Sequence, residues 1–433
     1  MTSNLKFKNS EKLFDDVLKI IPLASQTFSK SSMNFPRGIS PLFFEKGDGA
    51  YVYDVDNNKY IDFLLGLLPI ILGYRDPDVN LSIINQLEKG ITFSLPTDLE
   101  YKLARILCDM IPGAEMVRFA KNGSDVTSAA IRLSRAHNGK NIIAVCGYHG
   151  WHDWYIGTTS MKKGIPDESI KLTKTFEYNN IDSLKAIIDS HPNDISAVIL
   201  EPVTFVPPNK GFLEDIRSLC TENDIVLIFD EIISGFRIDL GGAQKKFGVT
   251  PDLSTFGKSM SNGMPLSALV GKKELMQKVN EIFFSGTFGG ETLSLAASIA
   301  TLKKLKKIDA PKIFNETGKV YKENINNSIL NYGLEELLSV GGMNWWPKIN
   351  INSSSSISQM ELNTLLRQEL ISKGVFISST INLSASNCSN KIVNDALNIF
   401  DESIKNISSY LKSSNPRKYL KGELIQPVFT TRK

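Results

Sequence analysis

The 433-residue sequence predicts an α/β protein with a doubly wound sheet between about residues 75 and 315. Three observations favour this fold class. The chain is too long for one ordinary hydrophobic core, so it should form two lobes. Short apolar runs bounded by polar residues or glycine are typical of strands covered on both faces. Helix-like segments alternate with these runs, as in a sheet flanked by helices.

The expected elements follow in chain order. An amphipathic stretch at residues 11–21 comes first, and residues 50–63 alternate around the turn 54–58, which predicts a small β-hairpin. The strands of the central sheet are predicted at residues 116–120, 142–146, 197–200, 226–229 and 266–270, and its helices at residues 124–136, 213–223 and 292–305.

The pattern changes after Pro311, which predicts a second lobe of the α+β class. Amphipathic helices there accompany strands expected at residues 348–351 and 374–377. We expect the tail after Leu411 to be only loosely ordered.

Composition excludes several classes of function. A net charge of +3 with 42% apolar and 22% charged residues is typical of a soluble globular protein without a nucleic-acid partner. The four cysteines and four histidines form no metal-ligand spacing, so no metal site is expected. We expect a cytoplasmic protein with no membrane contact, because the N-terminus lacks an apolar signal core and no apolar run could span a bilayer.

Two charged residues are the first candidates for chemistry. Asp230 follows an apolar strand and should lie at the carboxyl end of the sheet, where open α/β sheets bind ligands. By itself an aspartate there is more often a turn cap. Lys258 lies among small residues in a turn bounded by glycines. Its Gly-Lys-Ser context is no P-loop, because Asp252 stands where that motif requires glycine.

Two further segments add a phosphate cradle and an aromatic ring. Asn122, Gly123 and Ser124 open a helix directly after a strand, where backbone amides can bind one phosphate. An ordinary serine N-cap is the alternative. Tyr148 follows the next strand, and its ring could stack on a planar cofactor or simply pack. No GxGxxG opens the helix, which disfavours a dinucleotide.

Together these residues predict a pyridoxal-phosphate enzyme. That cofactor needs a phosphate anchor, a stacking ring, an acid on its pyridine nitrogen and an imine-forming lysine. Asp230 would keep the pyridine nitrogen protonated, Tyr148 would fix the ring plane, and Lys258 would hold the cofactor and shuttle the substrate proton.

The motifs resemble those of class III aminotransferases of pyridoxal-phosphate fold type I, in the branch of glutamate-1-semialdehyde aminomutase. The resemblance rests on the segments 41–56, 71–74, 116–125, 130–135, 148–150, 201–203, 229–237, 256–258 and 286–290. It implies a large doubly wound αβα domain at residues 76–315. A small α+β domain would be built from both chain ends, residues 1–75 and 316–433.

The resemblance also implies roles for individual residues. The phosphate would lie on the cradle at residues 122–124, with Tyr148 over the ring, Asp230 on the ring nitrogen and Lys258 in the imine. Thr287 would reach the phosphate of a neighbouring subunit, which implies a homodimer with shared active sites. Glu201 matches an acid near the cofactor, although its role could be purely structural.

Departures from the aminomutase favour an aminotransferase. The position of the arginine that would hold a substrate carboxylate aligns near Ser32, and Lys30 and Arg37 are the candidates to replace it. We therefore expect amino transfer to or from an aldehyde- or keto-bearing small molecule. The alternatives are the aminomutase reaction itself and a non-catalytic cofactor-binding protein, against which the intact Lys258 and Asp230 speak.

Three segments resemble relatives in surface-carbohydrate pathways: residues 27–31, 289–297 and 345–347. The last contains Trp345 and Trp346, which could form an apolar wall for a sugar. A tryptophan pair that packs the core of the small lobe is at least as plausible.

Overall fold

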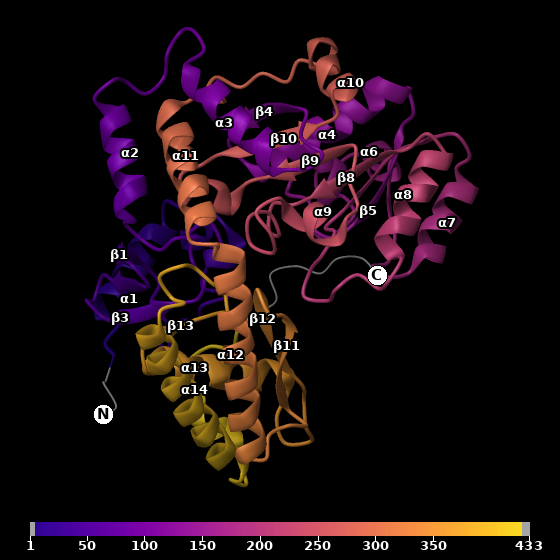
Figure 1. Ribbon diagram of the computed structural model, residues 1–433. Helices are drawn as coiled ribbons and strands as arrows, with labels where there is room; N and C mark the ends of the chain where they lie inside the picture. The colour runs from indigo at the N-terminus through magenta and orange to yellow at the C-terminus, as the bar shows by residue number, and fades with distance from the viewer. Residues whose placement is uncertain (1–4, 427–433) are drawn as a thin grey trace. The chain divides into compact units, whose positions relative to one another are not determined.

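The computed structural model describes residues 5–426, which form two compact units (Figure 1). One unit contains residues 5–76 and 312–426, and the other contains residues 77–311. No helix among the described residues is long and apolar enough to cross a membrane.

The unit of residues 77–311 is built on a seven-stranded sheet of order β4-β10-β9-β8-β7-β5-β6. Strand β10 is antiparallel to both of its neighbours, and all other strands run in one direction. The strands are β4 (Met116–Ala120), β5 (Ile142–Cys146), β6 (Thr173–Thr175), β7 (Ile195–Leu200), β8 (Val226–Asp230), β9 (Leu253–Phe256) and β10 (Ser267–Gly271).

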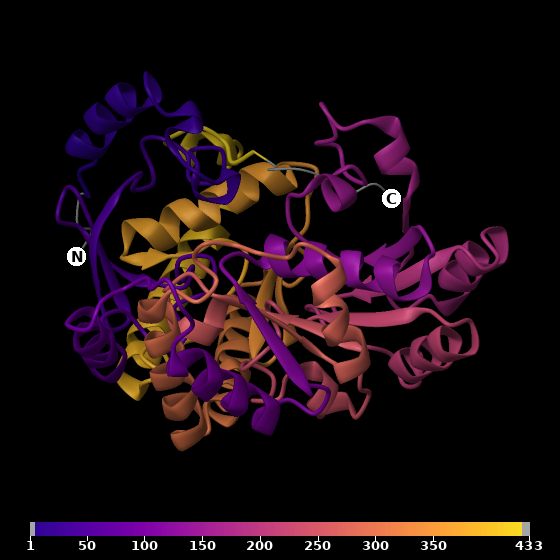
Figure 2. The same ribbon diagram turned by 90° about the horizontal axis from the view of Figure 1, so that it is seen from above.

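Helices cover both faces of this sheet (Figures 1 and 2) because alternate strand residues point to opposite sides. Ile143 and Val145 pack with the helices α4 (Gly123–Asn138) and α10 (Lys273–Met276). Their neighbours Ile142 and Ala144 pack with α7 (Ile181–Ser190) and α8 (Phe212–Glu222) on the other face. The sheet is therefore doubly wound, which confirms the predicted fold class.

This unit contains six further α-helices and two 3-10 turns among the described residues. They are α2 (Pro77–Leu87), α3 (Asp98–Met110), α5 (Asp153–Ile156), α6 (Asp167–Lys171), α9 (Gly242–Phe247) and α11 (Thr292–Lys307), with the 3-10 turns η3 (Lys258–Ser261) and η4 (Gln277–Glu281). The predicted helix at 292–305 extends two residues further.

The other unit joins segments from both ends of the chain. Strands β1 (Phe44–Asp48), β2 (Tyr51–Asp54) and β3 (Lys59–Asp62) form an antiparallel meander, and β13 (Val375–Phe376) adds to β3 in parallel. The hairpin β11 (Leu338–Met343) and β12 (Trp346–Ile351) forms a second sheet. Its helices are α1 (Lys8–Leu18), α12 (Ala310–Asn331), α13 (Gln359–Ser372) and α14 (Asn390–Leu411).

The prediction that the tail after Leu411 is loosely ordered is wrong for residues 412–426. Tyr419, in the turn η5 (Pro416–Tyr419), stacks on Tyr410 with ring centroids 4.1 Å apart. Its carbonyl accepts a hydrogen bond from Gln368 of α13, and Ile425 is buried. Sequence reasoning missed this order because the apolar residues of the tail are isolated. Residues 427–433, which the same prediction covered, lie outside the described part of the chain.

The two tryptophans of residues 345–347 belong to the core. Trp345 and Trp346 are 3% and 7% exposed and stack on each other. The Trp346 indole nitrogen donates to the side chain of Asn382. The packing interpretation of this pair therefore holds in the folded chain, and the pair offers no open wall to a sugar.

Candidate active site

Five predicted site residues follow parallel strands and so meet at one edge of the seven-stranded sheet. Because β4, β5, β7, β8 and β9 run in one direction, their carboxyl ends share that edge. Asn122, Tyr148, Glu201, Asp230 and Lys258 stand at or just after these five ends.

Asp230 ends β8 and is almost fully buried, at 4% exposure. One carboxylate oxygen, Oδ1, accepts hydrogen bonds from the Thr255 hydroxyl and the Ile232 amide, each at 3.1 Å. The other, Oδ2, lies 2.8 Å from Nδ1 of His149. These contacts fix the orientation of the carboxylate from three directions.

His149 was missed by the sequence analysis, although it is the neighbour of Tyr148. Its ring is buried, with Nδ1 on Asp230 and Nε2 3.1 Å from the Cys146 carbonyl oxygen. These two contacts hold the His149 ring between Asp230 and the end of β5. A signal was present in the sequence: His149 follows a predicted strand, as Asp230 does, so both could be expected at the same edge of the sheet.

Lys258 begins the turn η3 directly after β9 and is partly buried. Its backbone has φ 41°, in the left-handed region that a lysine rarely adopts. Burial lowers the pKa of its ammonium group to about 8, and the charges of Asp230 and Glu201 oppose this shift. A lysine amine that is easily deprotonated is a nucleophile and a proton carrier.

Glu201 lies close to these groups after β7. Its Oε2 accepts a hydrogen bond of 2.9 Å from the Tyr148 amide. Burial, followed by the nearby Asp230 charge, raises the pKa of the Glu201 carboxyl. Gly147 is needed beside it, because a Cβ at that position, with φ 108°, would lie 2.6 Å from the Glu201 carboxylate. Glu201 therefore orients the chain that carries Tyr148.

The first turn of α4 lies where the sequence predicts a phosphate cradle, directly after β4. Asn122 is the N-cap, and the backbone amides that follow it point out of a 16-residue helix. The Ser124 hydroxyl accepts a hydrogen bond from the Trp151 amide at 3.2 Å. A Cβ on Gly150 would lie 2.2 Å from that hydroxyl, so the loop approaches the helix as closely as glycine permits. A cradle, an acid and a lysine on one sheet edge fit the chemistry of pyridoxal phosphate.

Tyr148 presents its ring at the same edge and is 44% exposed. The ring meets Tyr155 edge-on, with centroids 5.6 Å apart and planes at 87°. Tyr155 in turn donates its hydroxyl hydrogen to the Gly147 carbonyl, which fixes the pair. One face of Tyr148 can thus stack on a planar ligand.

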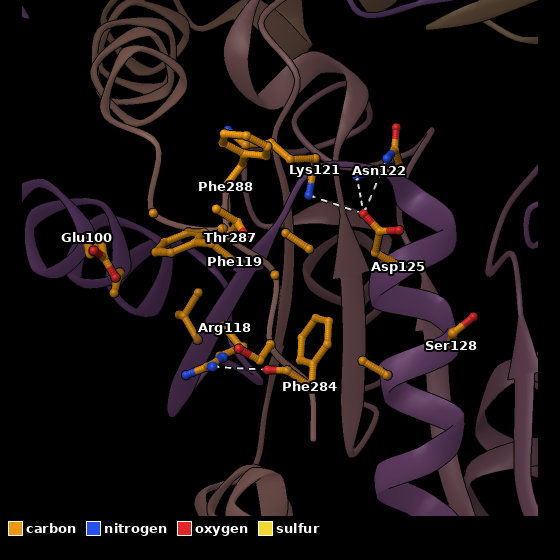
Figure 3. A pocket seen from close by; sticks show the side chains of 18 of the residues that line it. Glu100, Arg118, Phe119, Lys121, Asn122, Asp125, Ser128, Phe284, Thr287 and Phe288 are labelled. Atoms are coloured by element: carbon orange, nitrogen blue, oxygen red, sulfur yellow. Dashed lines mark hydrogen bonds between the residues drawn. The ribbon is translucent and has the colours of Figure 1, made fainter. Parts of the chain in front are cut away.

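Thr287 lies in an exposed loop between η4 and α11. It lines a pocket of about 890 Å³, and Asn122 lines the same pocket (Figure 3). Arg118 donates to the Phe284 carbonyl at 3.0 Å, and Lys121 pairs with Glu291 at 2.8 Å, so both ends of the loop are anchored. Tyr148, Glu201, Asp230 and Lys258 do not line this pocket. Within one chain, Thr287 therefore shares this pocket with Asn122 and not with those four residues.

The two candidates for a carboxylate clamp lie in the other unit. Arg37 is already engaged: its guanidinium lies 2.6 Å from Glu11 and 3.0 Å from Asp15, and these acids raise its pKa. Lys30 is exposed. Arg37 is thus a structural residue of this unit, and Lys30 is the candidate that is left.

Comparison with known proteins gives consistent matches. The family described as "Aminotransferase class-III" matches residues 34–385. A 3-aminobutyryl-CoA aminotransferase of Cloacimonas acidaminovorans is 38% identical over 385 residues, covering 87% of this chain and 92% of the relative. A glutamate-1-semialdehyde 2,1-aminomutase of Lachnoclostridium phytofermentans is 36% identical over 351 residues, covering 76% and 82%.

Solved structures agree in fold. The FumI protein of Sphingopyxis sp. MTA144, solved with pyridoxal phosphate, superposes with a TM-score of 0.87 at 26% identity, covering 95% of this chain and 100% of that one. An omega-transaminase of Sphaerobacter thermophilus gives a TM-score of 0.81 at 26% identity, covering 92% and 97%.

Proposed function

The chain belongs to the class III aminotransferase family and is a pyridoxal-phosphate-dependent enzyme, and from this premise we propose that it transfers an amino group between a donor and a small aldehyde or ketone. The observation that carries the proposal is the position of Lys258. Its amine lies at the same sheet edge as Asp230, and burial makes it easy to deprotonate.

Each residue of the site has a separate proposed role toward the cofactor or the substrate. The cofactor, when bound, supplies an electron sink for the amino-bearing carbon. Asn122, Gly123 and Ser124 hold its phosphate at the start of α4. Asp230, oriented by His149, would accept a hydrogen bond from the protonated ring nitrogen and keep it protonated, and Tyr148 would cover the ring. Lys258 moves a proton at the substrate carbon, with its low pKa keeping a free amine available near neutral pH.

The substrate is proposed to lack a free carboxylate for an arginine clamp to hold. Arg37 is held by two acids, and Ser32 stands near the position of the family's clamp. A β-amino acyl thioester fits this requirement, and the name of the Cloacimonas relative gives such a substrate. An amino or keto sugar fits it as well. The surface-carbohydrate hypothesis now depends on residues 27–31 and 289–297 alone, because the tryptophan pair is buried.

The second candidate is the aminomutase reaction, in which both amino positions belong to one substrate. Aminomutase relatives 34–41% identical to this chain favour it. The absence of an arginine near Ser32 disfavours it, because glutamate-1-semialdehyde carries a free carboxylate.

A homodimer with shared sites is part of the proposal. Phe283 and Phe288, on either side of Thr287, are 87% and 59% exposed. Large apolar side chains grouped on one exposed loop are typical of a surface that another chain covers. A second copy covering this loop would let Thr287 reach the phosphate of its partner.

The deciding experiment follows the cofactor's absorbance in purified protein. A lysine-bound cofactor should absorb at roughly 410–430 nm, and an amino donor alone should abolish that band if the enzyme works by ping-pong transfer. Glutamate, 3-aminobutyryl-CoA and an amino sugar are compared as donors. Rapid turnover of glutamate-1-semialdehyde with no external donor would instead establish the aminomutase. Absence of the band after addition of pyridoxal phosphate would contradict both.

A further inference from the structure

Residues 416–426, here called the strap, are bound along the helix α13 in the unit that is built from both chain ends. The side chain of Gln368 on α13 is buried, and it bonds the backbone of the strap in both directions. Its nitrogen donates to the Tyr419 carbonyl and its oxygen accepts from the Lys421 amide, each at 2.9 Å. The strap is therefore fixed to α13 through its own backbone.

The strap also contacts the N-terminal loop that precedes β1. The Gln426 amide donates to the Met33 carbonyl at 2.8 Å. Gly422 lies so close to this loop that a Cβ on it would be 2.5 Å from the Arg37 carbonyl oxygen. The strap thus joins α13 to the loop, although the two are more than 300 residues apart in the chain.

Asn34 connects the same helix to the turn that carries Lys30. Arg367 of α13 is 6% exposed, and its Nη1 donates to the backbone and side-chain oxygens of Asn34 at 3.0 and 2.9 Å. The side-chain nitrogen of Asn34 donates to the Ser29 carbonyl at 3.0 Å. Ser29 precedes Lys30 in the 3-10 turn η2 (Phe28–Lys30). A buried cation of α13 therefore fixes, through Asn34, the backbone next to Lys30.

Lys30 is the only charged residue between positions 25 and 36, and it is exposed. Burial raises the pKa of the Asp62 carboxyl, and the charge of Lys30 is among the groups that oppose this rise, so the two lie near each other. Three leucines after Asp62 have a left-handed backbone: Leu65 (φ 51°), Leu67 (φ 76°) and Leu68 (φ 83°). Strained backbone of this kind is concentrated at functional sites. The turn thus places an exposed cation beside a segment with that property.

We propose that Asn34 and the strap are positioning elements for the substrate, which hold the Lys30 turn (residues 27–34) where Lys30 can bind an anionic group of the substrate. The inference rests on the proposed amino transfer, because it gives Lys30 the substrate contact that Arg37, held by two acids, cannot make. Lys30 touches the substrate, whereas Asn34 and the strap act only through the turn. Neither of them belongs to the cofactor cradle, so cofactor binding does not depend on them.

Hydrogen exchange of the cofactor-loaded protein tests the role of Asn34. Asn34→Asp keeps an oxygen for Arg367 but loses the nitrogen that donates to Ser29, so the amides of the Lys30 turn should exchange about tenfold faster. Asn324→Asp is the matched control, because Asn324 is exposed on α12 and its nitrogen also donates to a backbone carbonyl. Equal exchange of the turn in the two variants would overturn the role of Asn34.

Two further variants test the strap by the same measurement. Gly422→Ala pushes the strap away from the Arg37 carbonyl in a full-length chain, and the turn should again exchange faster. A chain that ends at Ser413 lacks the strap and should show a larger effect, with thermal unfolding as the check that the unit stays folded. Wild-type exchange of the turn in Gly422→Ala would contradict the role of the strap, whatever the shortened chain does.

Kinetics separate positioning from folding. The donors are glutamate and 3-aminobutyryl-CoA, because both carry anionic groups. Lys30→Ala should raise the half-saturating donor concentration about tenfold, as expected for one charge-assisted hydrogen bond, and should leave the band at roughly 410–430 nm unchanged. Asn34→Asp should raise that concentration too. In the Lys30→Ala background it should have no further effect, because Asn34 acts through Lys30.

The outcomes distinguish this inference from the proposed function. Additive effects of Lys30→Ala and Asn34→Asp, or wild-type half-saturation in Lys30→Ala, would overturn the inference while amino transfer stands. A wild-type band that persists with both donors would contradict the proposed function, and with it the substrate contact of Lys30.

Discussion

At the scale of single residues, the chemistry depends on buried charges that hold one another. Asp230 is oriented by three hydrogen bonds. Burial lowers the pKa of the Lys258 amine to about 8, so the amine loses its proton easily. His149 is the side chain that contacts the second oxygen of this buried carboxylate, Oδ2, at 2.8 Å. The direction of the Asp230 carboxylate is therefore fixed before any ligand binds, as its proposed role at the ring nitrogen of the cofactor requires.

His149→Gln should lower kcat by about tenfold to a hundredfold, because one charged hydrogen bond to Asp230 is worth roughly 1.5–3 kcal/mol. The cofactor should still bind, since its phosphate and lysine contacts remain. The pH dependence of kcat should also change, which a merely structural role would not produce. His191→Gln, a histidine remote from the sheet edge, is the control, and equal kinetics of the two variants would contradict the assignment.

The pH dependence of cofactor loading reports on Lys258. The lysine attacks only as the free amine, and burial lowers its pKa to about 8. The loading rate of the cofactor-free protein should therefore rise with pH and level off above about 8. Stopped-flow absorbance measures this rate. A rate that still rises steeply towards pH 10.5, the value of a solvated lysine, would show that burial has no such effect.

At the scale of elements, the start of α4 is positioned by glycines in the neighbouring loop. Gly150 has φ 105°, and its Cα approaches the Ser124 hydroxyl so closely that a methyl group does not fit. The loop and helix therefore interlock where the phosphate is expected. Asp125 completes the capping box by accepting from the Asn122 amide at 2.8 Å.

Gly150→Ala should reduce cofactor affinity at least tenfold, because the new Cβ displaces Ser124 or the first turn of α4. Gly139→Ala is the matched control, since Gly139 at the end of the same helix has φ 69° and open space around its Cβ position. Both variants should lose about 1–2 kcal/mol for the left-handed backbone. Fluorescence titration of the cofactor-free proteins separates the two, and equal affinities would contradict the steric account.

At the scale of the whole molecule, the proposed dimer makes the active site a property of two chains. Lys258 and Thr287 would serve the same cofactor from different subunits. The prediction is complementation. Lys258→Ala and Thr287→Ala proteins should each be weakly active or inactive, and mixing them should restore activity at the one site that combines Lys258 of one chain with Thr287 of the other.

Activity should recover to at most half the wild-type value in such a mixed dimer, after unfolding and refolding of the two variants together. Sedimentation of each variant checks that both assemble. No recovery in a verified mixed dimer would show that Thr287 acts within its own chain or not at all.

The sequence by itself determined the order of strands and helices. Strands covered by helices on both faces appear in the sequence as continuous apolar runs, and the helices between them begin at recognisable capping residues. The same motifs specified the family and its cofactor, and comparison confirmed both. The residues of the site follow strand ends, so their common edge could be anticipated. Their roles as cofactor contacts stay predictions.

Only the tertiary structure decided which side chains are held by contacts with other residues and which remain available for chemistry. His149 meets Asp230 across 81 positions of the chain, and Arg37 is held by Glu11 and Asp15, so neither fact is written in a local pattern. The burial of Trp345 and Trp346 and the packing of Tyr419 likewise depend on distant segments. Local sequence encodes backbone preference, but the pairing and burial of a charge or ring depend on contacts that form only when the chain has folded.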